Sequence, residues 1–66
     1  MVWVLDKNAD QIINASYIKR FGRDIKIYDV TGEHMTHIYN TENEAKESFE
    51  RLVNWLTNGG KGVFSL

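Results

Sequence analysis

Short runs of apolar residues, separated by polar and turn-forming positions, fill the first 40 residues of the chain. Residues 2–5 (VWVL) are branched or aromatic, and residues 11–14 (QIIN) resume this character after the polar stretch DKNAD. Runs of this kind between turn-forming residues are typical of strands. We therefore expect residues 2–5 and 11–14 to form a hairpin, followed by a bend at residues 14–16.

The segment from residue 17 to residue 40 continues the strand pattern. Residues 17–21 are extended in character, and Gly22 predicts a bulge or a tight connection. Residues 24–30 alternate like a half-buried strand, and residues 33–40 follow as an antiparallel partner after the turn at residues 31–32.

The register of this second hairpin depends on the length of its loop. A loop of two residues pairs Tyr28 with Met35, whereas a loop of three residues pairs Ile27 with Met35. A slip of one residue exchanges the two faces of the strand, and the sequence is compatible with both registers.

The strongest local signal is a helix over residues 42–58. Thr41 and Glu44 form a capping-box pattern, and Glu42 suits the positive end of the helix dipole. The stretch NGGKG at residues 58–62 resembles a phosphate-binding loop in its glycine content. It follows a helix instead of preceding one, however, so we interpret it as the helix stop. Apolar residues at steps of three and four form one stripe along this helix: Ala45, Phe49, Leu52, Val53 and Leu56.

These elements predict an α+β fold in one domain, residues 1–66. We expect an antiparallel meander of four to five short strands with one helix, in the C-terminal half, packed on one face. Residues 62–66 are apolar enough for a last short strand, placed at a sheet edge or under the helix.

Length and composition limit the function further. A chain of 66 residues buries a small core, and without cysteine it has no disulfide or thiolate site to add stability. Self-association is therefore expected. The apolar run after Met1 has only four residues, too few for a secretion signal or a membrane span, so we expect a cytoplasmic protein without membrane contact.

The net charge of −1 gives no general attraction to nucleic acid, but the basic residues are clustered. The stretch YIKRFGRDIKIY, residues 17–28, interleaves aromatic and basic side chains as single-strand nucleic-acid binders do. The alternative is that Phe21, Ile25 and Ile27 face the helix while the basic residues keep an exposed sheet soluble. A nucleic-acid site would use Lys19, Arg20, Arg23 and Lys26.

Signals for catalysis and metal binding are weak. His34 and His37 are three positions apart in a predicted strand, which places them on opposite faces and prevents a shared metal ion. No serine lies in a nucleophile motif, and the acids around the second hairpin are expected to be solvated: Asp24, Asp29 and Glu33. We expect no enzyme, no cofactor and no metal site.

One further pattern combines residues of the first hairpin with the start of the helix: Trp3, Ile12, Ile13, Asn14, Tyr39, Thr41, Glu44 and Ala45. This pattern resembles small uncharacterised α+β proteins encoded by phages and mobile elements of Gram-positive bacteria. The resemblance implies a protein that acts by binding, either to a host protein or to a nucleotide signal.

A single helix covers only one face of a sheet, yet the chain has several further large side chains to place. Alternation along the strands sends some of them to the far face, where aromatic residues and arginine are typical of interfaces. The leading hypothesis is a non-enzymatic, homo-oligomeric binding module that contacts a macromolecule or a small anionic ligand through that face, and single-stranded nucleic acid is the alternative. The candidate binding residues are Trp3, Lys19, Arg20, Arg23, Tyr28 and His37.

Overall fold

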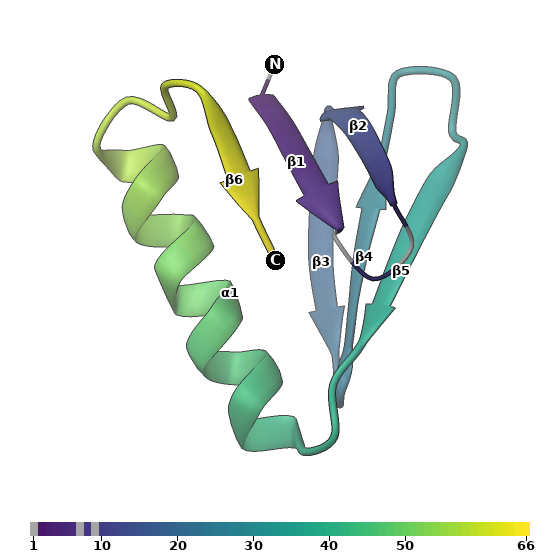
Figure 1. Ribbon diagram of the computed structural model, residues 1–66, viewed down its shortest axis with the longest axis vertical. Helices are drawn as coiled ribbons and strands as arrows, with labels where there is room; N and C mark the ends of the chain where they lie inside the picture. Colours follow the sequence, from purple (N-terminus) through teal and green to yellow (C-terminus); the bar gives the residue numbers. More distant parts are fainter. Residues whose placement is uncertain (1, 7, 9) are drawn as a thin grey trace.

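The computed structural model describes residues 2–6, 8 and 10–66, and it has the expected α+β architecture (Figure 1). The predicted loop after the first strand includes Lys7 and Ala9, which lie outside the described residues. In chain order the elements are β1 (Val2–Asp6), β2 (Gln11–Ala15), β3 (Tyr17–Phe21), β4 (Asp24–Tyr28), β5 (His34–Ile38), α1 (Glu42–Thr57) and β6 (Val63–Ser65).

The described strands form two sheets of three strands each. One sheet has the order β2-β1-β6 and the other has the order β3-β4-β5. The expected meander accounts for β1 to β5, since each of their pairings is antiparallel. The last strand, β6, lies at a sheet edge and pairs in parallel with β1.

A corner at Ser16 joins the two sheets. The Ser16 N–H donates to the carbonyl oxygen of Tyr28 at 2.8 Å, and the next residue, Tyr17, is also opposite Tyr28. Ser16 and Tyr17 therefore both lie opposite Tyr28. Such a pair of residues opposite one residue is a β-bulge, which bends the strand that contains it. The chain therefore leaves one sheet after Ala15 and enters the other at Tyr17, and the predicted bend is confined to Ser16.

The turns of the second sheet fix its register. Gly22, with a φ of 60°, is the first residue of a two-residue connection between Phe21 and Asp24, so it forms a tight turn. The next hairpin pairs Ile27 with Met35, which is the register of the three-residue loop. Gly32 closes that loop with a φ of 90°, a value that favours glycine.

The helix begins at the predicted residue, Glu42, and ends one residue earlier than predicted, at Thr57, with Asn58 as its C-cap. The Thr41 hydroxyl oxygen accepts from the Glu44 N–H at 3.1 Å, which is the first half of the capping box. At the other end the Gly59 N–H donates to the Leu56 carbonyl at 3.1 Å, and the Gly60 N–H donates to the Trp55 carbonyl at 2.9 Å. These two bonds define a Schellman motif, so the glycine-rich stretch ends the helix.

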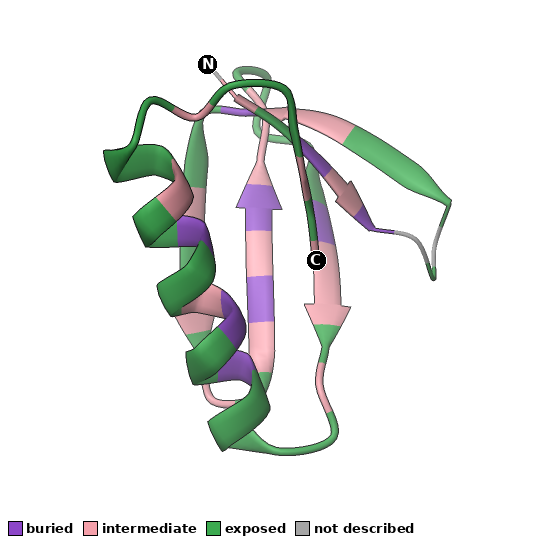
Figure 2. Cartoon of the chain, turned by 60° about the vertical axis from the view of Figure 1, so that its left-hand side comes forward, coloured by how far each residue is buried: buried purple, intermediate pink, exposed green. Residues whose placement is uncertain are grey.

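The core lies between the two sheets and extends to the helix. Its buried members come from four strands, and Ala45 and Leu52 of α1 are fully buried as well. The buried positions of α1 lie on the side of the helix turned toward the strands (Figure 2). Among the described residues, no helix combines the length and the apolar character required to cross a bilayer. The buried apolar residues of the strands are Val4, Ala15, Ile25, Ile27 and Met35.

We predict that Thr41→Ala lowers the free energy of unfolding by about 1 kcal/mol, because the Glu44 N–H loses its acceptor. Urea denaturation followed by circular dichroism measures this loss. Thr41→Ser keeps the oxygen and should unfold like the unmodified protein. Equal losses in both variants would show that the cap contributes nothing.

Candidate binding face of the second sheet

The face of the β3-β4-β5 sheet that points away from the core is the candidate site, and we call it the outer face. Ile25 and Ile27 point into the core, so the residues between and beside them in β4 point outward. The strand register extends this assignment to β3 and β5 and gives three cross-strand rows. The rows are Tyr17–Tyr28–His34, Lys19–Lys26–Thr36 and Phe21–Asp24–Ile38.

The first row is a continuous line of rings. The centroids of Tyr17 and Tyr28 are 5.6 Å apart, and those of Tyr28 and His34 are 5.3 Å apart, with tilted planes in both pairs. Directly opposed aromatic residues stabilise a sheet through such contacts. Tyr17 nevertheless remains 56% exposed, so its ring also presents a surface to solvent.

Positive charge lies beside this row. The Lys19 ammonium group is 5.7 Å from the centroid of the Tyr28 ring, within cation–π range. Lys26 is the cross-strand partner of Lys19 in the middle row, so two ammonium groups share the centre of the outer face. Arg23 lies in the turn at the end of this sheet, where its guanidinium donates to the Asn40 carbonyl at 3.5 Å.

The third row exposes large apolar side chains. Phe21 is 78% exposed and Ile38 is 64% exposed, on either side of Asp24. The alternative in which Phe21 faces the helix is therefore wrong, whereas Ile25 and Ile27 are buried as that alternative expects. The two-residue turn at Gly22 decides this, because it pairs Phe21 with Asp24 on the outward side of β4.

The structure brings together only some of the candidate binding residues. Lys19 and Tyr28 share the outer face, and Arg23 lies at its end. Arg20 is on the inward side of β3, where its guanidinium donates to the Gly22 carbonyl at 2.9 Å. The leading site expected from the sequence does not include Phe21, Lys26 and His34. Strand alternation was a signal that could have placed these three residues on the same face.

Trp3 and His37 lie elsewhere. Trp3 is 47% exposed on the side of β1 opposite the buried Val4, so it belongs to the outward side of the other sheet. His37 is on the inward side of β5, while His34 is on the outer face. The expected separation of the two histidines onto opposite faces is thus observed.

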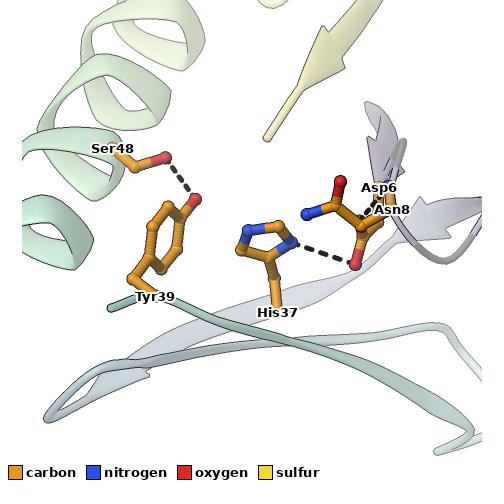
Figure 3. A network of polar contacts seen from close by, with 5 residues as sticks. All are labelled: Asp6, Asn8, His37, Tyr39 and Ser48. Atoms are coloured by element: carbon orange, nitrogen blue, oxygen red, sulfur yellow. Dashed lines mark hydrogen bonds and ion pairs between the residues drawn. The ribbon is translucent and has the colours of Figure 1, made fainter. Parts of the chain in front are cut away.

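His37 connects the two sheets. Its Nδ1 atom lies 3.0 Å from a carboxylate oxygen of Asp6, whose side chain is only 3% exposed (Figure 3). The other carboxylate oxygen of Asp6 accepts from the Asn8 N–H at 3.0 Å. Because Asp6 ends β1 and His37 belongs to β5, this contact fastens one sheet to the other.

A second polar contact fastens the helix next to this pair. The hydroxyl groups of Tyr39 and Ser48 are 2.6 Å apart, and the rings of His37 and Tyr39 have centroids 4.4 Å apart (Figure 3). Burial raises the pKa of the Tyr39 phenol, while the Ser48 hydrogen bond and the charge of Arg51 oppose the rise. Ser48 is bonded to the phenol and not to the imidazole, so the group differs from a serine–histidine–aspartate triad.

Among the acids of the second hairpin, Asp29 closes the turn. One carboxylate oxygen of Asp29 accepts from the Thr31 hydroxyl at 2.6 Å, from the Thr31 N–H at 2.9 Å and from the Glu33 N–H at 3.1 Å. The hydrogen bond from the Thr31 hydroxyl is the main reason that the pKa of Asp29 is lowered. This carboxylate is ionised and occupied by the turn.

Comparisons with protein-family models, with curated proteins and with solved structures find no match.

We predict that Tyr39→Phe destabilises the protein by about 1–3 kcal/mol, because the buried Ser48 hydroxyl loses its partner. The double variant Tyr39→Phe/Ser48→Ala removes both polar groups and should recover part of this loss. Chemical denaturation measures both variants, with Tyr17→Phe on the exposed face as the control. A double variant that is less stable than the single variant would contradict this role of the hydrogen bond.

Thr31→Ala should raise the pKa of Asp29 toward its ordinary value, since the hydroxyl that stabilises the carboxylate is removed. A lowered pKa in the folded state stabilises the fold above the unfolded pKa, and this contribution is lost as the pH falls through the lowered value. An NMR titration of the Asp29 carboxyl carbon measures the change. Thr36→Ala, on the outer face, is the matched control and should leave this titration unchanged.

Proposed function

We propose that this protein binds single-stranded nucleic acid through the outer face of the β3-β4-β5 sheet. The observation that carries the proposal is the row Tyr17–Tyr28–His34 beside the paired lysines Lys19 and Lys26, on a sheet face that neither the helix nor the other sheet covers. Single-strand binders combine these two elements, since bases stack on rings while ammonium groups contact phosphates.

The exposure of the rings supports stacking. Tyr17 is 56% exposed and Phe21 is 78% exposed, at opposite ends of β3. A base can therefore lie against either ring, and every base has a flat face for such a contact. The middle row of lysines lies between these two ring positions, so a strand that reaches both passes over Lys19.

The charges predict weak, short-range attraction. The net charge of −1 provides no long-range steering, and Asp24 is on the same face as the two lysines. For a single strand, two phosphate contacts correspond to a slope of about −1.4 in a plot of the logarithm of the binding constant against the logarithm of the salt concentration. Most of the affinity then comes from stacking, and little sequence preference is expected.

The exposed pair Phe21 and Ile38 supports a second candidate, a protein partner on the same face. Apolar side chains of this exposure are typical of interfaces when they lie within a polar rim. A protein partner would contact Phe21 and Ile38 and would show little dependence on salt.

The test is fluorescence anisotropy with labelled oligo(dT) and oligo(U) at low salt. Tyr17→Ala should weaken binding by about 5- to 100-fold, corresponding to one lost stacking contact on an exposed ring. Lys19→Gln/Lys26→Gln should reduce the magnitude of the salt slope by about 1.4. Lys61→Gln removes one charge beyond the helix and is the control that should bind normally.

Competition with unlabelled mononucleotides and oligonucleotides tests how long a ligand the site requires. Competition by oligonucleotides alone supports a strand that crosses several rows, whereas equal competition by a mononucleotide indicates a single-nucleotide site. Failure to bind either oligonucleotide at low salt rejects the proposal.

A further inference from the structure

An apolar groove runs between α1 and the edge of β3. It has a volume of about 450 Å³ and is lined mainly by hydrocarbon side chains from both walls. Val53 and Leu56 remain 43% and 39% exposed at its opening. The helix contacts both β3 and β4 of this sheet, and β3 is the strand on the helix side in Figure 1. The lining includes Val2, Ile18, Phe49, Leu52, Val53 and Leu56.

One wall of this groove is the open edge of a sheet. β4 is the neighbour of β3 within its sheet, and β3 is an edge strand. The two-residue turn pairs Phe21 with Asp24, so the alternation of an antiparallel ladder directs the backbone groups of Phe21 and Lys19 toward β4. The backbone groups of Ile18 and Arg20 then point out of the sheet, beside the groove.

The apolar groove needs apolar side chains, whereas the backbone groups at the strand edge need hydrogen-bond partners. An extended peptide supplies both. The peptide backbone forms hydrogen bonds with the edge of β3, and every second side chain enters the groove. A small apolar molecule would fill the groove but would leave the backbone groups at the edge of β3 without hydrogen-bond partners. A second copy of this chain paired through β3 would bring its own α1 to the same face of the sheet, next to the first helix.

We propose that an extended segment of another protein adds to β3 as a fourth strand, with alternate apolar side chains in the groove beneath α1. The intervening side chains of that segment lie on the outer-face side, next to Lys19. Acidic residues at those positions complement the lysine. The partner segment therefore alternates apolar and acidic residues and contains no proline at the bonding positions.

The probe is an acetylated and amidated hexapeptide of alternating valine and glutamate, titrated into the ¹⁵N-labelled protein. We expect amide shifts along β3 and slower hydrogen exchange at the Ile18 and Arg20 amides. N-methylation of one alternate set of peptide amides should abolish binding, and methylation of the other set should leave it intact, since a strand bonds through one side. Equal effects of the two methylated peptides would overturn strand addition.

Val53→Glu tests the groove without altering the core, because this side chain is partly exposed. It should weaken peptide binding by roughly 10-fold or more, since a carboxylate is placed in the apolar opening. Val30→Glu, at a position 75% exposed in the loop between β4 and β5, is the matched control and should bind the peptide normally.

The remaining outcomes are also decisive. Concentration-dependent dimerisation that Val53→Glu removes, with no peptide binding, would assign the groove to a second copy and overturn the proposal. Retained oligonucleotide binding in Val53→Glu shows that the outer face acts independently, so failure at either site can be distinguished from failure at the other.

Discussion

The corner at Ser16 determines the arrangement of the whole molecule. One backbone hydrogen bond, from the Ser16 N–H to the Tyr28 carbonyl, holds the bend between β2 and β3. The bend folds the β1–β2 hairpin back over the inward side of the β3-β4-β5 sheet, where Val4 meets Ile25 and Ile27. The apolar side chains that form the core are thereby directed to one side, and the other side of the second sheet stays uncovered. The candidate binding face is a direct result of this geometry.

The sequence predicts well the features that depend on neighbouring residues. The helix limits follow from Thr41 and from the glycines after Asn58, because capping is a local interaction. The hairpins follow from the alternation of Ile25 and Ile27 and from the glycines in the turns. The capping residues and the turn glycines act within a few positions of their partners, so a single sequence contains the information.

The features that escape prediction depend on residues far apart in the chain. The two sheets are joined by the contact between Asp6 and His37, and no local pattern indicates that these two side chains meet. The inward position of Arg20 and the outward position of Phe21 depend on the length of one turn, and a shift of one residue would reverse both. The candidate residues expected from the sequence consequently lie on two different sheets.

The parallel pairing of β1 with β6 also affects how the protein opens and closes. The β3-β4-β5 meander is made of contacts between strands that follow one another in the sequence, whereas β6 pairs with β1 across almost the whole length of the chain. Pairings between distant segments form slowly because the closure of a long loop precedes them. β6 has β1 as its neighbour within the sheet, and its Phe64 ring also contacts Trp55 of the helix, with centroids 5.4 Å apart. The two sheets thus differ in how their strands are joined: one is built from local pairings alone, while the other also needs a pairing between segments far apart in the chain.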